Sequence, residues 1–152
     1  MIADFHDLLD AFRAQQVRFL VVGAHALAVY GVPRVTGDLD LWIEPTPANA
    51  ARVWQALAAF GAPLDTLGIS EADFARADQV VQLGLPPYRI DIMTSISGID
   101  FARGWDGRAA GTLFEVPVAF IGRDALIVNK RASGRPKDLE DVRALEGPGG
   151  PT

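Results

Sequence analysis

The segment from Phe19 to Glu44 constrains the fold most strongly, because its hydrophobic period changes twice. "FLVV" is a continuous apolar run typical of a buried strand, and it ends at Gly23. The alanine-rich "AHALAVYG" favours a short helix, which Gly31 and Pro33 stop. "DLDLWIE" then returns to the alternation of a strand. The sequence therefore predicts strand, short helix and strand as the local unit of an α/β protein.

The remainder of the chain continues this alternation. Apolar residues at helical spacing predict a helix over residues 2–15, and Thr46, Pro47 and Gly61 mark the ends of another. Further patterns predict strands at 79–85, 88–94 and 114–120 and helices at 70–76, 99–105, 123–132 and 136–145. We expect an α/β (α+β) fold with helices flanking a small, mixed, twisted sheet. One domain should span residues 1–146, followed by a disordered tail at 147–152.

Composition narrows the chemistry and the setting. The chain of 152 residues has no cysteine and only two histidines, so oxygen ligands are expected for any metal. Its net charge of −5 argues against binding bulk nucleic acid. No apolar run approaches the length of a membrane span, and the N-terminus lacks a signal-peptide pattern. We therefore expect a cytoplasmic protein with no membrane partner.

Three aspartates are expected to meet on neighbouring strands. Alternation places Asp38, Asp40 and Trp42 on one face of "DLDLW", and Asp91 on the corresponding face of "YRIDIMT". Such close carboxylates raise a pKa unless a cation lies between them, and hard oxygen ligands select Mg²⁺ or Mn²⁺. Two acids in a strand would alone more often be a solvated face. Together with Gly23 and Asp91, they indicate a magnesium site of the kind used in nucleotidyl transfer.

The turn at Gly23-Ala24 adds a candidate contact for phosphate, since a glycine between strand and helix lets the backbone approach an anion. With this turn, the sequence resembles the DNA polymerase β-like nucleotidyltransferase superfamily. Its signature is an apolar residue, Gly, then Gly or Ser, nine to thirteen residues, and Asp, apolar, Asp or Glu, apolar. The matching residues are Val22-Gly23-Ala24, thirteen intervening residues, and Asp38-Leu39-Asp40-Leu41. Ala24 departs from the family, which has Gly or Ser there.

The resemblance implies roles for the acidic residues. Asp38 and Asp40 would hold two metal ions. Asp91, which matches the family's third acidic residue, would complete one metal site and accept the proton of the acceptor hydroxyl. The implied cofactor is Mg²⁺ or Mn²⁺, and the implied substrate is an NTP, with ATP as the first candidate.

Two further motifs resemble compact bacterial nucleotidyltransferases of toxin–antitoxin and abortive-infection systems. These motifs are "R-x-T-x-D-h-D", present as residues 34–40, and "K-D-x-x-D", present as residues 137–141. Lys130 lies on an otherwise apolar helix, where it is either a triphosphate contact or a lysine that reaches solvent. The candidate nucleotide-binding residues are Gly23, Ala24, Arg34, Thr36, Lys130 and Lys137. The roles of His25 and Trp42 stay open between local packing and ligand contact.

The expected function is Mg²⁺-dependent transfer of a nucleoside monophosphate from an NTP to a hydroxyl. The preferred acceptor is a partner protein, toxin or antitoxin, or a tRNA end. One alternative is transfer to a small alcohol such as an antibiotic. The other is a catalytically inactive nucleotidyltransferase-like binding module, which the alanine at position 24 suggests.

Overall fold

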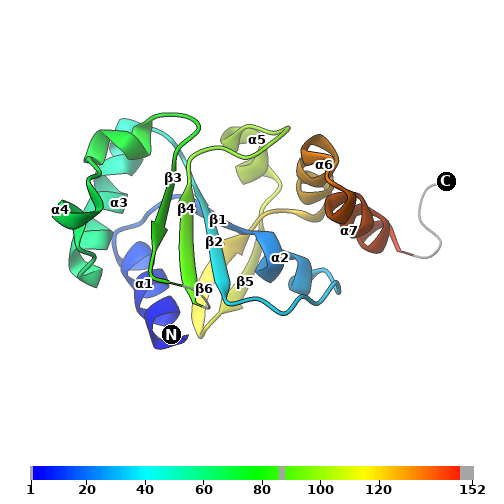
Figure 1. Ribbon diagram of the computed structural model, residues 1–152, viewed down its shortest axis with the longest axis horizontal. Helices are drawn as coiled ribbons and strands as arrows, with labels where there is room; N and C mark the ends of the chain where they lie inside the picture. Colours follow the sequence, from blue (N-terminus) through cyan, green and yellow to red (C-terminus); the bar gives the residue numbers. More distant parts are fainter. Residues whose placement is uncertain (1, 86–87, 148–152) are drawn as a thin grey trace.

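The computed structural model describes residues 2–85 and 88–147. Within these residues, six strands form one mixed sheet in the order β3-β4-β2-β1-β6-β5 (Figure 1). Helices α1, α3 and α4 lie on one side of the sheet, and α2, α6 and α7 lie on the other (Figure 1). The expected α/β fold, with a small mixed sheet flanked by helices, is confirmed.

The elements follow one another in an alternation close to the predicted one. In chain order they are α1 (Ile2–Ala14), β1 (Phe19–Val22), α2 (Gly23–Val29), β2 (Asp38–Ile43), α3 (Pro47–Phe60), α4 (Leu64–Leu67), the 3₁₀ helix η1 (Glu71–Ala75), β3 (Val80–Leu83), β4 (Arg89–Met93), α5 (Phe101–Asp106), β5 (Ala109–Leu113), β6 (Val116–Phe120), α6 (Arg123–Ser133) and α7 (Pro136–Glu146).

Strand pairing explains how distant segments meet at the centre of the sheet. Strand β2 pairs parallel with β4 and antiparallel with β1, and β1 pairs parallel with β6. The side chains of Leu39, Leu41 and Ile92 on the central strands are fully buried in the core. This apolar face leaves the alternate residues of β2 and β4 pointing to the opposite side, where the aspartates lie.

The third helix shows how the local sequence sets its ends. The hydroxyl of Thr46 accepts a hydrogen bond from the Asn49 amide at 3.3 Å, and Pro47 occupies the first turn. Gly61 ends the helix in the left-handed conformation, with φ of 91°. Both predicted boundaries of this helix are confirmed.

The prediction missed α4 and β5 and extended the next strand too far. The sequence of β5, "AAGTL", is rich in small residues and lacks the alternation of a typical strand. It pairs antiparallel with β6 through a turn in which Phe114 and Glu115 have positive φ, 48° and 69°. The predicted strand at 114–120 therefore begins at Val116, because its first two residues form this turn.

The sequence also predicts a disordered C-terminal tail and no membrane-spanning helix. Residues 148–152 of the predicted disordered tail lie outside the described residues, so only Gly147 of the tail is seen. Within the described ranges, no helix has both the length and the apolar character needed to cross a bilayer.

Candidate active site

The three predicted aspartates lie side by side on the two central strands. In the parallel pairing of β2 with β4, Asp40 stands opposite Asp91, and Asp38 stands opposite Arg89. These four residues line one cavity of about 460 Å³. Asp91 is buried, whereas the Asp38 side chain is 38% exposed and lies nearer to solvent. The predicted convergence of the carboxylates is therefore confirmed by the strand register.

Arg89 places one positive charge beside the acidic cluster. Its Nε donates to Asp91 Oδ1 at 2.9 Å, and its Nη2 donates to Asp91 Oδ2 at 3.2 Å. The same Nη2 reaches Asp38 Oδ2 at 3.4 Å. The sequence predicts a divalent metal ion among these carboxylates, and the structure places the guanidinium of Arg89 beside two of them. Alternation along "YRIDIMT" places Arg89 on the face of Asp91, so the signal for it lies in the sequence.

Asp40 differs from its neighbours because Arg89 does not hydrogen-bond to it. Burial, together with the negative charges of Asp91 and Asp38, raises the pKa of Asp40 to about 6. The carboxylate also packs against Gly23, which has φ of 69°, and a Cβ there would stand 2.1 Å from Asp40 Oδ2. Glycine is therefore required at this turn to seat Asp40, in addition to the backbone approach to phosphate expected from the sequence.

The raised pKa predicts a pH-dependent stability difference between wild type and Asp40→Asn in EDTA. The pKa of this carboxyl group is higher in the folded protein than in the unfolded chain, so the folded state binds the proton more tightly. The stability that this tighter binding gives is lost as pH rises through the folded pKa. The two proteins should be similar in stability at pH 4. By pH 7 the variant should be more stable by about 2 kcal/mol, a value discounted for partial exposure. Urea unfolding across this range measures the difference, and a constant difference would contradict the assigned cause.

The three aspartates offer the kind of ligand atom that a hard divalent cation prefers, but their side chains do not surround a common metal position in this structure. Asp38, Asp40 and Asp91 offer only carboxylate oxygens, which Mg²⁺ and Mn²⁺ prefer. Among the residues that the structure describes, however, no group of three or more His, Asp or Glu side chains stands ready around a common metal position. Arg89 engages two of the three carboxylates, those of Asp38 and Asp91.

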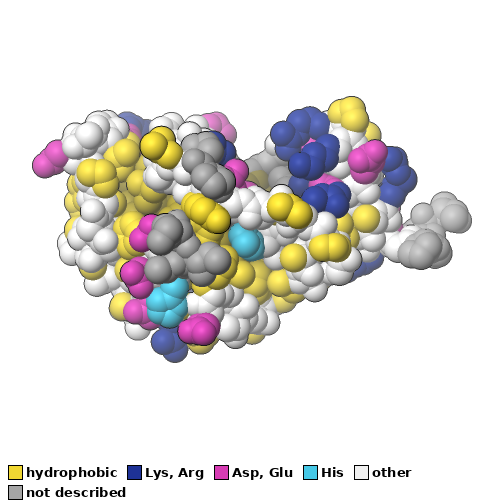
Figure 2. Space-filling model, turned by 60° about the horizontal axis from the view of Figure 1, so that its bottom comes forward, with side chains coloured by type: hydrophobic (Ala, Val, Ile, Leu, Met, Phe, Trp, Pro, Cys, Tyr) yellow, Lys and Arg dark blue, Asp and Glu magenta, His cyan; other side chains and the backbone are white. Residues whose placement is uncertain are grey.

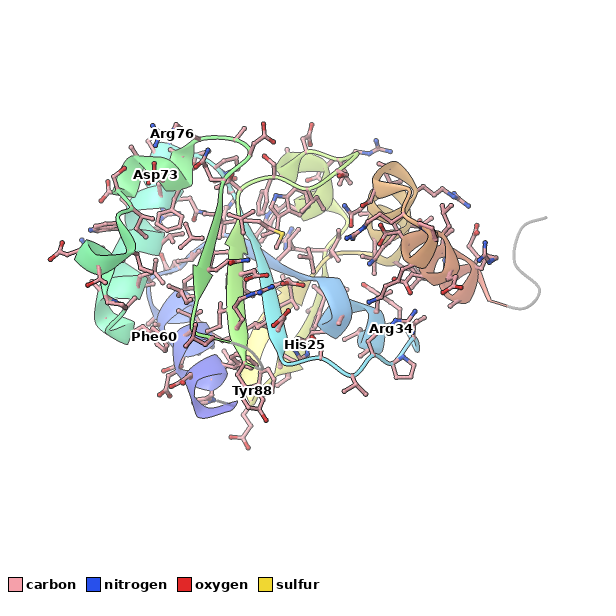
Figure 3. The ribbon with its side chains drawn as sticks, viewed as in Figure 1. His25, Arg34, Phe60, Asp73, Arg76 and Tyr88 are labelled. Atoms are coloured by element: carbon pink, nitrogen blue, oxygen red, sulfur yellow. The ribbon has the colours of Figure 1, made fainter. Side chains whose placement is uncertain are left out.

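The opposite wall of the cavity is basic and comes from α6, α7 and the loop before β2. Arg34 hydrogen-bonds to Asp141, and Lys130 lies 3.2 Å from Asp141 and 3.4 Å from Asp138. Arg135 donates to Asp138 at 2.7 Å. Figure 2 shows Lys and Arg side chains gathered over this end of the molecule. Figure 3 shows Arg34 on the loop after α2, on the side of α7.

The two aspartates of the late motif are therefore inward-facing members of this network. Asp138 and Asp141 are 1% and 0% exposed. Burial would raise the pKa of Asp138, but hydrogen bonds from Arg135 and Ser133 and the charge of Lys130 lower it to about 2. The network holds the basic side chains at the cavity wall. The reading of Lys130 as a lysine that simply reaches solvent is wrong, because its side chain is only 14% exposed.

The remaining predicted nucleotide-binding residues also line the cavity. Gly23, Ala24, Thr36 and Lys137 all contribute to its wall. The Thr36 hydroxyl accepts a hydrogen bond from the Asp38 amide at 3.0 Å, which ties the "R-x-T-x-D" loop to the first residue of β2. Lys137 is exposed, and no ion pair engages it within the described part of the chain.

His25 and Trp42 do not become ligand contacts of this cavity. Trp42 shares the parity of the aspartates but is 1% exposed, and its ring packs edge-on against Phe101 with centroids 5.2 Å apart. It is a core residue rather than a platform for a base. Figure 3 shows His25 at the start of α2. Burial lowers the pKa of His25, and its ring packs against Phe114 with centroids 5.5 Å apart.

The fold is that of a compact nucleotidyltransferase-like domain. A Thermotoga maritima protein, TM1012, provisionally described as a nucleotidyltransferase, is similar to this chain with a TM-score of 0.60 and 14% identity. The match covers 90% of this chain and 86% of that one. No protein-family model matches the sequence, and no curated protein matches it.

Two antibiotic-related structures are similar to the same extent. The lincosamide antibiotic adenylyltransferase LnuA, solved with lincomycin bound, gives a TM-score of 0.60 at 13% identity, covering 95% of this chain and 96% of that one. ANT(2")-Ia, solved with adenylyl-2"-tobramycin, gives a TM-score of 0.58 at 17% identity, covering 95% and 86%. At these identities the likeness establishes the fold.

Proposed function

We propose that the protein is a nucleotidyltransferase that moves a nucleoside monophosphate from an NTP to a hydroxyl group. The observation that supports this proposal most strongly is the separation of charge within one cavity. Three carboxylates on β2 and β4 face a basic wall formed by α6, α7 and the loop before β2. Such a cavity offers one end to metal and acceptor and the other to the triphosphate. The similar solved structures include enzymes of this class.

The residues divide the reaction between the two ends of the cavity. Asp38, Asp40 and Asp91 would hold Mg²⁺ or Mn²⁺, which when bound lowers the pKa of the attacking hydroxyl and stabilises charge on the phosphates. Lys130 and Lys137 would contact the triphosphate. The acceptor oxygen forms a bond to the α-phosphorus, the bond from that phosphorus to the β-phosphate oxygen breaks, and pyrophosphate leaves. Asp91 would accept the hydroxyl proton.

Two classes of acceptor fit the proposed reaction. Both LnuA and ANT(2")-Ia are described with small antibiotic molecules, and this favours a small alcohol as the acceptor. A partner protein or a tRNA end in a toxin–antitoxin setting is the second candidate, suggested by the two sequence motifs at residues 34–40 and 137–141. Incubation with labelled ATP, Mg²⁺ and each acceptor class in turn distinguishes them by the molecule that becomes labelled.

Replacing Asp91 with asparagine should reduce turnover more than nucleotide binding. Asp91 is assigned to the acceptor proton and to one metal, whereas the triphosphate contacts lie on the opposite wall. We expect the rate to fall at least about a hundredfold, the typical contribution of a general base, and the dissociation constant of the nucleotide to change by less than about fivefold. Single-turnover kinetics and calorimetry measure the two quantities. Equal losses in both would remove the proton-accepting role.

A catalytically inactive binding module is the competing function. Ala24 provides no hydroxyl to a phosphate, and Arg89 engages the carboxylates that would bind metal. Such a module would bind an NTP without releasing pyrophosphate. A pyrophosphate-release assay with ATP, GTP, CTP and UTP, run with and without a small-alcohol acceptor, separates it from the enzyme, because only the enzyme breaks the bond between the α-phosphorus and the β-phosphate oxygen.

A further inference from the structure

The guanidinium of Arg89 contacts two of the three carboxylates that would hold a metal ion, those of Asp38 and Asp91. Its fork engages both oxygens of Asp91, at 2.9 Å and 3.2 Å, and one oxygen of Asp38, at 3.4 Å. We propose that Arg89 is a built-in counterion that competes with the divalent cation for Asp38 and Asp91, so that metal loading requires its side chain to leave the cluster. This inference rests on the proposed function, which places the metal on these carboxylates.

The position of Arg89 is fixed by the sheet rather than by a mobile loop. It lies two residues before Asp91 on β4, so both side chains share one face, and it stands opposite Asp38 in the β2–β4 register. Its pairing with the acids is therefore the default state of the folded chain. A divalent cation seeks the same carboxylate lone pairs and is repelled by a guanidinium at close range. The two cations cannot both occupy the centre of the cluster.

The single positive charge of Arg89 does not balance the negative charges of all three carboxylates in the cluster. One guanidinium faces the three carboxylates of Asp38, Asp40 and Asp91, and it donates no hydrogen bond to Asp40. The Arg89 side chain is 29% exposed, so it has an open route towards the cavity and solvent. The arrangement thus gives a metal site that is closed by default and opens when a cation and its nucleotide outcompete the arginine.

The test is Mn²⁺ binding to the full chain without nucleotide, measured by titration calorimetry. Arg89→Met keeps an unbranched side chain similar to the aliphatic part of arginine and removes the guanidinium, and it should bind Mn²⁺ at least about tenfold more tightly than wild type. Lys137→Met is the matched control, because it removes a positive charge from the opposite wall of the same cavity, and no ion pair of Lys137 with a carboxylate is present in the described part of the chain. Its affinity should change by less than about threefold, as expected for a screened exposed charge.

Several outcomes would overturn the inference. Equal or weaker Mn²⁺ binding by Arg89→Met would do so, and so would an equal gain in Lys137→Met, which would show a general charge effect. If wild type binds Mn²⁺ and Asp40→Asn binds it more weakly while Arg89→Met matches wild type, this inference fails and the proposed metal site stands. If none of the proteins binds Mn²⁺, both fail.

A second variant covers the case in which Arg89→Met does not fold. Arg89→Lys keeps the positive charge but cannot form the two-pronged contact with Asp91, so its Mn²⁺ affinity should lie between those of wild type and Arg89→Met. Melting in EDTA and in Mn²⁺ gives an independent readout. Both variants should melt below wild type in EDTA and gain more than wild type from Mn²⁺. A gain equal to that of wild type would overturn the competition.

Discussion

Alanine at position 38 or 40 is expected to lower the rate of nucleotidyl transfer about a thousandfold, or roughly 4 kcal/mol in transition-state stabilisation. Asp38 and Asp40 stand on the same face of β2 and are the proposed ligands of both metal positions. Each substitution removes a carboxylate that no neighbouring residue of the strand can replace. The measurement is release of pyrophosphate, or transfer of label from NTP, under single-turnover conditions with excess Mg²⁺.

A control variant separates this loss from a general effect of removing negative charge. Asp124 is the second residue of α6, and its side chain is 99% exposed. Asp124→Ala should transfer label at the wild-type rate within about twofold, since exposed charges outside the cavity are largely screened. Wild-type turnover in both Asp38→Ala and Asp40→Ala would eliminate the proposed site.

Asp141→Ala is expected to lower the free energy of unfolding by about 3 kcal/mol. Asp141 is fully buried, accepts a hydrogen bond from Arg34 and pairs with Lys130 at 3.2 Å. Its removal leaves Lys130, which is nearly buried, with Asp138 as its remaining partner. Removing one member of a buried ion pair costs several kcal/mol, because the partner stays desolvated. Urea unfolding in EDTA measures the loss.

An exposed ion pair between the same two helices serves as the control for this prediction. Glu146 pairs with Arg131 at 2.8 Å, also at the α6–α7 end of the molecule, and Arg131 is 55% exposed. Glu146→Ala should change the free energy of unfolding by about 0.5 kcal/mol, as is usual for an exposed ion pair. Similar small losses in Asp141→Ala and Glu146→Ala would show that the buried network does not hold α7 to the cavity wall.

The acidic side of the site could be predicted from the sequence because strand geometry is simple. Successive residues of a strand alternate between faces, so "DLDLW" and "YRIDIMT" each place their aspartates on the face opposite Leu39, Leu41 and Ile92. The apolar partners Leu39, Leu41 and Ile92 determine which face is buried. The two short segments then meet in register once the strands pair, and no long-range information is needed beyond that pairing.

The charge partners could not be predicted in the same way. Alternation places Arg89 beside Asp91 but does not decide whether an arginine or a metal lies between the carboxylates, since both satisfy the same charge demand. The inward direction of Asp141 depends on how α7 packs against α6 and the loop of Arg34. A helix pattern with charged residues on several faces does not reveal this packing. Strand β5 was missed for a related reason, because its pairing with β6 rather than its composition makes it a strand.

Binding of metal and nucleotide by the three carboxylates can be tested without knowledge of the acceptor, by comparing the unfolding of wild type and Asp40→Asn. In EDTA at pH 7 the variant should be the more stable protein by about 2 kcal/mol, for the reason given by the raised pKa of Asp40. With Mg²⁺ and an NTP at about 100 times its dissociation constant, wild type should gain roughly 2.7 kcal/mol, and the variant should lose most of that gain. The order of stability should therefore reverse for at least one of ATP, GTP, CTP and UTP. Equal shifts of the two proteins with every nucleotide would contradict a metal-nucleotide site at these carboxylates and the transferase function built on it.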